Sequence, residues 1–155
     1  MRYTYDVYTS AKPGSTPCAC TTVKKLSRIL GRAYDAGLTG SGINVTQFAV
    51  LRCIARRAGE PLVRVADELE MDRTSLYRAL EPMTREGWVT LNAGGDARSR
   101  TARLTKKGTQ LVAKAARQWD ETQDRLIRRF GKRSYNDLVA ELYRLAECVE
   151  SVDAG

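Results

Sequence analysis

A group of side chains suited to hydrogen bonding stands between residues 73 and 78. Its members are Arg73, Thr74, Ser75, Tyr77 and Arg78. Arginine can bind guanine through two hydrogen bonds, serine and threonine can bind a base or a phosphate, and tyrosine can meet a phosphate or a thymine methyl. Leu76, Leu80 and Met83 recur at helical spacing, so the polar group would occupy the opposite face of one helix. The group predicts a surface that reads the major groove of double-stranded DNA, although any solvated helix face can carry these residue types.

A second basic group surrounds a turn at Gly94-Gly95-Asp96. Residues 88–91 and 101–104 alternate as antiparallel strands do, so the turn would be the tip of a hairpin. Asp96 and Arg98 can pair on one side of that tip, which would hold the guanidinium for insertion into a narrow minor groove. The alternative is an exposed salt bridge worth less than about 1 kcal/mol. Two further arginines complete the candidate DNA contacts, Arg64 and Arg100.

The elements that would position these groups follow one another without a gap. A short helix is predicted over about 63–69, Asp72 can cap the polar-faced helix, and the hairpin comes next. This is the order of a winged helix-turn-helix. Pro82 should kink the polar-faced helix or end it early, since proline removes a backbone hydrogen bond.

Four more helical patterns are present, two before this unit and two after it. One begins at Ala19, the next has Thr46 as its expected N-cap, and a third extends from Thr105 to Gly131. The last begins with a capping box formed by Ser134 and Asp137. Its apolar residues alternate three and four apart, as in a helix that packs on another helix, and they are Tyr135, Leu138, Leu142, Leu145 and Val149.

The predicted fold is therefore mainly α with a small β-wing, a winged helix-turn-helix plus long dimerisation helices. We expect an N-terminal arm over residues 1–17 and a single domain over 18–155, with the winged helix-turn-helix at about 45–105. The dimerisation helices are expected at about 19–38, 105–131 and 134–151. Their apolar surface exceeds what the winged unit can cover, so a second copy of the chain is the simplest partner.

Composition limits the function classes. The 155 residues hold 26 Lys and Arg against 18 Asp and Glu, a net charge of +8 that suits a polyanionic partner. The chain has no histidine, which removes Ser/His and Cys/His catalysis and the commonest zinc sites, so we expect no catalytic residues, no cofactor and no metal. It has neither an apolar segment of membrane-spanning length nor a signal-peptide core, which predicts a cytoplasmic protein without a membrane partner. Its cysteines would then be thiols.

The hairpin carries a resemblance to a known family. Asp96-Ala97-Arg98-Ser99-Arg100, followed by Leu104-Thr105-Lys106-Lys107-Gly108, resembles the wing signature D-x-R-S-x-x-x-x-L-T-x-x-G of the MarR family of dimeric bacterial transcription regulators. The resemblance covers about residues 19–150. It implies that Thr74, Ser75, Tyr77 and Arg78 contact the major groove, that Arg98 contacts the minor groove, and that the first, fifth and sixth helices form a homodimer. Pro82 and the 17-residue arm depart from the family pattern.

The resemblance also implies a signal that lowers DNA affinity. Cys18 and Cys20 stand at the start of a helix, where the helix dipole favours the reactive thiolate. Some family members sense hydroperoxides there, with Cys148 a conceivable second thiol, whereas free cysteines often only pack, as we expect for Cys53. The rival signal is a small aromatic ligand between the dimer helices and the winged unit, with Tyr34, Phe48, Arg52 and Trp119 as its pocket or else as ordinary core.

Two function classes stay open at this point. The first is a homodimeric repressor that a small-molecule or oxidative signal releases from a pseudo-palindromic operator. The second is a winged-helix architectural or protein-interaction module without a specific operator. An enzyme is not expected.

Overall fold

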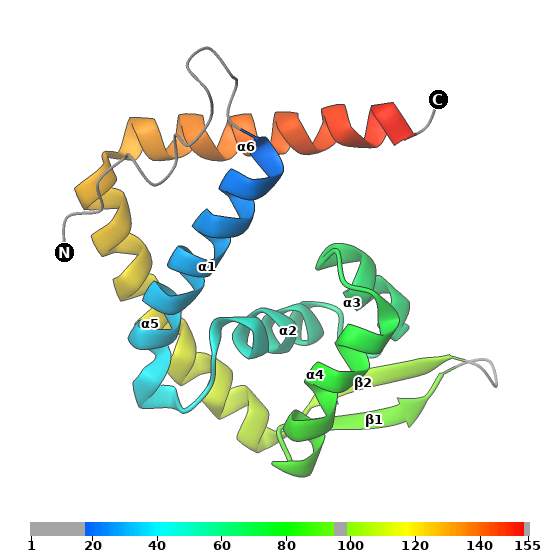
Figure 1. Cartoon of the computed structure of the whole chain (residues 1–155). Coiled ribbons are helices and arrows are strands. Elements are labelled where there is room, and N and C mark those ends of the chain that lie inside the picture. The colour runs from blue at the N-terminus through cyan, green and yellow to red at the C-terminus, as the bar shows by residue number, and fades with distance from the viewer. Residues whose placement is uncertain (1–17, 95–98, 154–155) are drawn as a thin grey trace, which may run out of the picture.

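The computed structural model describes residues 18–94 and 99–153, and Figure 1 shows how its helices and hairpin are arranged. The predicted arm and the wing residues 95–98 lie outside the described part. In chain order the elements are α1 (Ala19–Leu38), the 3-10 turn η2 (Thr39–Ser41), α2 (Val45–Arg56), α3 (Leu62–Glu68), α4 (Arg73–Arg85), β1 (Val89–Ala93), β2 (Arg100–Leu104), α5 (Lys106–Phe130) and α6 (Lys132–Asp153). The predicted fold class, mainly helical with one two-stranded antiparallel wing, is confirmed.

The core lies between α2, α3, α4 and the wing. Helix α2 buries Phe48, Leu51 and Ile54, and α4 buries Leu76 and Leu80, in the helical period that the sequence shows. Cys53 is fully buried in the same cluster, as expected for a core residue. One hydrophobic core therefore holds the polar-faced helix against the rest of the winged unit.

Helix α5 connects this core to the far end of the molecule. In Figure 1 it begins beside the wing and extends past α1, and α6 then crosses the end of α1 and continues beyond it. Helices α1 and α5 approach closely at Gly37, where a Cβ would lie 2.1 Å from the Thr122 hydroxyl oxygen. Any larger residue at position 37 would push the two helices apart.

The base of the wing is fixed by the Leu-Thr-x-x-Gly part of its motif. Thr105 caps α5 by accepting a hydrogen bond from the Gly108 N–H at 3.0 Å, and its hydroxyl donates to the Gly87 carbonyl at 2.7 Å. A Cβ at position 108 would lie 2.0 Å from the Trp88 carbonyl oxygen, so glycine is required there. These contacts join the start of β1 to the start of α5.

Two local predictions are wrong in detail, and a third is wrong in part. Helix α2 is capped by Asn44, which accepts from the Gln47 N–H at 2.8 Å, and not by Thr46. The reason is a contact with α1: the Val45 N–H donates to the Asp35 carboxylate at 2.7 Å, so the helix begins before Thr46. Asn44 is also favoured locally, because it ranks above threonine as an N-cap and its N–H donates to the Gln47 side-chain oxygen at 3.0 Å, which completes a capping box.

The second error concerns Ser134 and Asp137, which lie inside α6 and form no capping box. The helix begins at Lys132, because the Tyr135 N–H already donates to the Gly131 carbonyl at 2.9 Å. Gly131 has a φ of 93°, which ends α5 as predicted and turns the chain directly into α6.

The prediction for Pro82 was a kink in α4 or an early end, and the early end is wrong. The helix continues to Arg85, and the Glu86 N–H donates to the Pro82 carbonyl at 2.9 Å. Leu80 and Met83 on either side are fully buried, and their burial stabilises the last turn despite the hydrogen bond that proline cannot make.

Candidate nucleic-acid interface

The polar group on α4 is exposed to solvent, as its spacing predicts. The structure places Arg73, Thr74, Ser75, Tyr77 and Arg78 on the side opposite the core. Asp72 caps the helix by accepting from the Ser75 N–H at 2.9 Å, as predicted. The Ser75 hydroxyl also donates to the Asp72 carboxylate at 2.6 Å, and these two bonds lower the pKa of Asp72. The donor of Ser75 is therefore already used, which leaves its oxygen as an acceptor.

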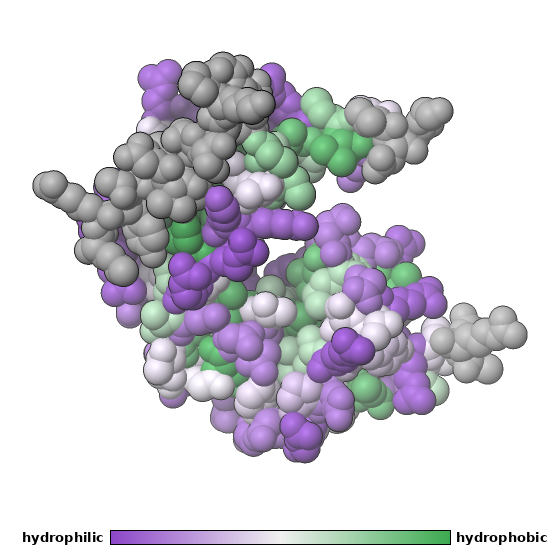
Figure 2. All heavy atoms as spheres, viewed as in Figure 1, coloured by the Kyte–Doolittle hydropathy of each residue, from purple (hydrophilic) through white to green (hydrophobic). Residues whose placement is uncertain are grey.

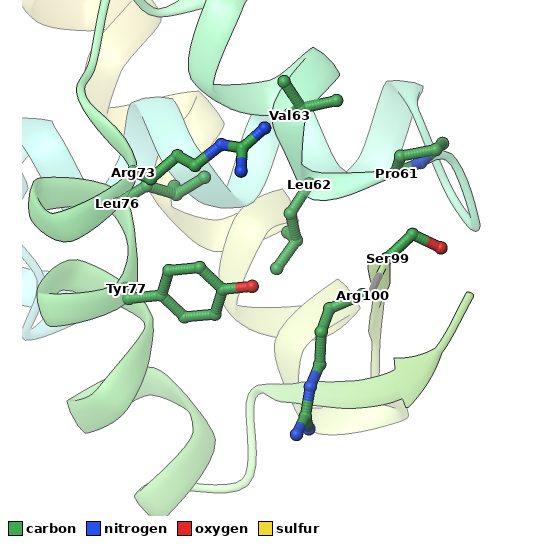
Figure 3. A pocket seen from close by; sticks show the side chains of 8 residues that line it. All are labelled: Pro61, Leu62, Val63, Arg73, Leu76, Tyr77, Ser99 and Arg100. Carbon is green, nitrogen blue, oxygen red and sulfur yellow. The ribbon is translucent and has the colours of Figure 1, made fainter. Parts of the chain in front are cut away.

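The remaining four side chains divide into two pairs. Arg73 and Tyr77 line a cleft of about 460 Å³ between α3, α4 and the wing (Figure 3). Thr74 and Arg78 each follow one of these two residues in the sequence and therefore project from a neighbouring face of α4. They form no side-chain hydrogen bond or ion pair with the described residues. The second pair is therefore available to base edges.

The cleft combines a basic rim with an apolar floor. Arg73 and Arg100 supply the charge, and Figure 3 shows Tyr77 with its hydroxyl directed into the space between α4 and β2. Its other lining residues are Pro61, Leu62, Val63, Leu76 and Ser99. The sequence did not predict this floor, because residues 61–63 reach the site through the packing of α3 on α4 and through the pairing of Pro61 with Thr101 of β2.

The other predicted DNA contacts come from α3 and the wing. Arg64 is exposed on α3, and Arg100 is the first residue of β2. The two strands pair in a single register, with Val89 opposite Leu104 and Ala93 opposite Arg100. The predicted pair of Asp96 and Arg98 lies outside the described residues.

The candidate redox thiols are accessible. Cys18, Cys20 and Cys148 are all exposed. Cys18 is the N-cap residue of α1, and the nearby N–H and hydroxyl of Thr21, together with the charge of Lys24, lower the pKa of its thiol. By contrast, burial and the neighbouring Glu68 carboxylate raise the pKa of Cys53. Cys18 is therefore the thiol whose environment favours thiolate.

The candidate ligand residues form one contiguous cluster. The Tyr34 and Trp119 rings stack at 6.0 Å, the Phe48 ring lies 6.4 Å from Trp119, and the Arg52 guanidinium lies 5.4 Å from Phe48 and 5.0 Å from Trp119. Phe48 is fully buried in the core, whereas Tyr34 lines an open groove of about 630 Å³ along α1. The four side chains thus pack on one another and only Tyr34 faces that groove.

The described part of the chain contains neither a metal-binding cluster nor a membrane-spanning helix. Within residues 18–94 and 99–153, no cluster of Cys, Asp and Glu could hold a metal ion. No helix of this part of the chain is both long and apolar enough to span a bilayer.

Comparisons with known proteins identify the family. The sequence model of the IclR helix-turn-helix domain matches residues 48–93, which cover α2 through β1. No curated protein matches the chain at a significant level. The solved structure of the M. tuberculosis transcriptional regulator MosR in complex with DNA is 36% identical, covers 85% of this chain and 98% of its own, and superimposes with a TM-score of 0.73.

More distant structures share the fold. The S. aureus MepR–DNA complex is 17% identical over 86% of this chain and 99% of its own, with a TM-score of 0.74. A regulator described as MarR family is 20% identical over 86% of this chain and 91% of its own, with a TM-score of 0.72. The relatives are transcriptional regulators and not enzymes, in agreement with the expectation from the sequence. The polar face of α4 is exposed beside a basic wing, on a fold shared with regulators solved in complex with DNA. This chain belongs to the MarR family of winged-helix, DNA-binding transcriptional regulators.

Proposed function

We propose that the chain acts as a homodimeric repressor on a pseudo-palindromic operator. The observation that carries the proposal is the exposed polar group of α4, whose Thr74 and Arg78 have no side-chain partner among the described residues and lie beside a basic cleft. One such helix covers one half-site, and two copies related by a two-fold axis would enter successive major grooves about 34 Å apart.

Each predicted contact has a distinct role in this proposal. Thr74 and Arg78 read base edges in the major groove, while Arg73, Tyr77 and Arg100 hold the DNA backbone along the cleft between α4 and the wing. Ser75 accepts from a base amino group while its own N–H and hydroxyl donate to Asp72, the cap of α4, and Arg64 neutralises a phosphate. Arg98, oriented by Asp96, would contact the minor groove as the family resemblance implies.

The dimer would form through α1, α5 and α6, with residues of about 45–105 as the reading unit. The support is apolar surface that this chain leaves uncovered: Leu138, Leu142, Leu145 and Val149 on α6 are exposed, as are Val23 on α1 and Phe130 on α5. Figure 2 shows hydrophobic side chains on the surface of α6 toward its C-terminal end. Such a patch on a single chain marks an interface.

For the releasing signal we propose oxidation at Cys18. The exposed thiol with a lowered pKa would attack the O–O bond of a peroxide, forming a sulfenic acid and releasing water or an alcohol. A second thiolate, of Cys20 or Cys148, could then displace water to form a disulfide. Either product adds bulk or a covalent bond at the N-terminal end of α1, beside the proposed dimer interface. A small rotation of the subunits there would misalign both reading helices.

A small aromatic ligand is the second candidate signal. The observation in its favour is the half-buried Arg52 guanidinium, which contacts two aromatic rings and forms no ion pair with the described residues.

The experiment that tests the function is selection of bound sequences from a random duplex pool. We expect one preferred site with two inverted half-sites, bound roughly 10³-fold or more tightly than random duplex at physiological salt. Weak or absent preference would favour the architectural module.

The redox proposal predicts a specific phenotype. A Cys18→Ser, Cys20→Ser double variant should bind the selected duplex as the wild type does, but its affinity should no longer fall after peroxide treatment. Cys148→Ser tests the second thiol. Its DNA affinity should still fall after peroxide treatment if a sulfenic acid or a Cys18–Cys20 disulfide is the signal, and should stay unchanged if Cys148 supplies the disulfide. Unchanged binding by wild-type protein whose thiols mass spectrometry shows to be oxidised would rule out these cysteines and favour the small-molecule signal.

A further inference from the structure

The wing is attached to the rest of the molecule at a second place besides its base. The loop between α2 and α3 runs along the outer edge of β2: the Gly59 N–H donates to the Ala102 carbonyl at 3.3 Å, and Pro61 pairs with Thr101. The Arg103 guanidinium covers Gly59 so closely that a Cβ there would lie 2.4 Å from it. The position of this loop therefore sets the position of the wing.

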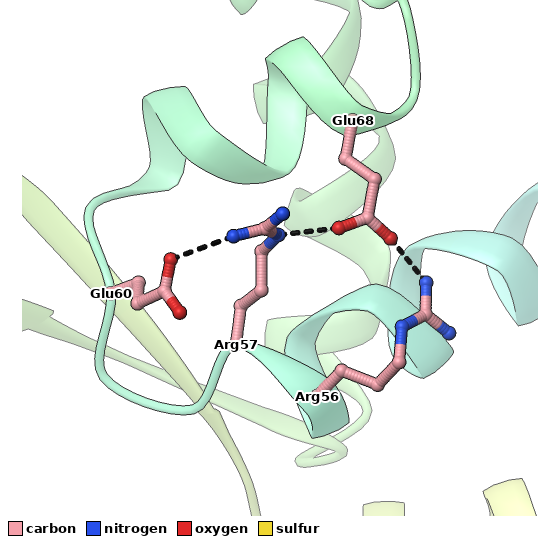
Figure 4. Close-up of polar contacts among 4 residues, drawn as sticks. All are labelled: Arg56, Arg57, Glu60 and Glu68. Atoms are coloured by element: carbon pink, nitrogen blue, oxygen red, sulfur yellow. Dashed lines mark hydrogen bonds and ion pairs between the residues drawn. The ribbon is translucent and has the colours of Figure 1, made fainter.

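The loop is in turn clamped to α3 by one side chain. Arg57, which follows the last residue of α2, pairs with Glu60 in the loop at 2.9 Å and with Glu68 at the end of α3 (Figure 4). Its side chain is only 33% exposed, and its two carboxylate partners lie on different nitrogens of one planar guanidinium. Arginine can hold both at once because its donors are fixed in a rigid fork.

Glu68 remains ionised over the whole range of ordinary pH. Hydrogen bonds from Arg56 and Arg57 lower its pKa to about 2. The clamp is therefore present wherever the protein would bind DNA, and it does not act as a pH switch.

Arg56 provides an internal comparison. It binds the same Glu68 carboxylate from the last turn of α2, but it forms no ion pair with Glu60 in the described part of the chain. Both arginines bring the same charge to the same region, and only Arg57 connects that region to the loop that carries the wing.

We propose that Arg57 is a positioning residue for DNA binding, which holds the wing at the angle to α4 that lets both touch one duplex. The inference rests on the proposed contact of the wing with DNA. Its physical basis is the chain of contacts from Glu68 on α3 through Arg57 and Glu60 to the loop, and from Gly59 and Pro61 to β2.

A double-mutant cycle with Arg100 of the wing tests the proposal on the duplex selected with wild-type protein. Arg57→Ala should lower affinity about tenfold, because the displaced wing loses its contact through Arg100. In an Arg100→Ala background that contact is already absent, so Arg57→Ala should lower affinity no more than about twofold further. Arg56→Ala removes the same charge, and its effect should be small and should multiply with that of Arg100→Ala. Equal losses for the two arginine variants, both independent of Arg100, would overturn the proposal.

Two further variants separate position from charge. Glu68→Ala removes a negative charge, so simple attraction to DNA predicts tighter binding, whereas loss of the clamp predicts weaker binding. Arg57→Lys keeps the charge but reaches one carboxylate at a time, so it should fall between wild type and Arg57→Ala. Tighter binding by Glu68→Ala would count against the clamp.

Hydrogen exchange keeps this inference distinct from the proposed wing contact. Exchange of the Gly59 amide, which donates to β2, should become faster in Arg57→Ala and stay unchanged in Arg56→Ala, with far-UV circular dichroism verifying that both are folded. If Arg100→Ala binds DNA as the wild type does, the wing contact is wrong. If exchange at Gly59 is also unaltered, the clamp is wrong as well.

Discussion

A Leu142→Asp variant is expected to sediment as a monomer or to unfold, while the wild type sediments as a dimer. Leu142 is 37% exposed in the single chain and lies in the apolar row of α6, four residues after Leu138 and three before Leu145. If a second copy covers this row, the aspartate would place an unpaired carboxylate in an apolar interface, at a cost of several kcal/mol. DNA binding should be lost with the dimer, because a single reading helix covers only half of the operator.

Ala140→Asp is the matched control for this prediction. Ala140 is exposed on the same helix, two residues from Leu142 and therefore on the opposite face. It should stay dimeric and folded. Sedimentation of Leu142→Asp as an intact, folded dimer would show that α6 does not form the interface through this row.

The second large effect is expected at Arg78. Arg78→Ala should cost about 1 to 3 kcal/mol on the selected duplex and relax preference at one or two base pairs, because a guanidinium that binds a base by two hydrogen bonds discriminates by that amount. The side chain is exposed and has no ion-pair partner in the described structure, so removing it should leave the dimer folded.

Arg85→Ala separates sequence reading from general attraction. Arg85 is exposed in the last turn of the same helix, nearly two turns beyond Arg78, and carries the same charge. It should lose little affinity and no preference. If Arg78→Ala instead weakens selected and random duplexes equally, Arg78 contacts phosphate and another residue reads the bases.

The ends of the helices could be predicted from the sequence to different degrees, for physical reasons. The ends of α5 were predictable because Thr105 and Gly131 act locally, the first as a cap and the second through a positive φ. The start of α2 was predicted two residues too late, although Asn44 and Gln47 carry a local capping-box signal; the bond from the Val45 N–H to the Asp35 carboxylate of α1 adds to that signal. The start of α6 was missed because Gly131 connects two helices without a loop.

The candidate site divides in the same way. Periodicity alone placed Thr74 and Arg78 on the exposed face of α4, since burial of Leu76, Leu80 and Met83 leaves no other orientation for the helix. It could not show that Arg73 and Tyr77 face the wing, nor that the Ser75 hydroxyl is bound by Asp72. Those facts depend on how α4 is rotated against its neighbours.

By itself, the sequence determined the order of the helices and the wing, the buried faces of α2 and α4 and the polar face of α4, because turn chemistry and hydrophobic period act over a few residues. Only the tertiary structure decided that Arg57 joins Glu60 to Glu68, that the α2–α3 loop pairs with β2, and that Tyr34, Phe48, Arg52 and Trp119 pack as one cluster. Each of those contacts joins residues from different elements, so its partners are chosen by the packing of the whole core and not by any local pattern.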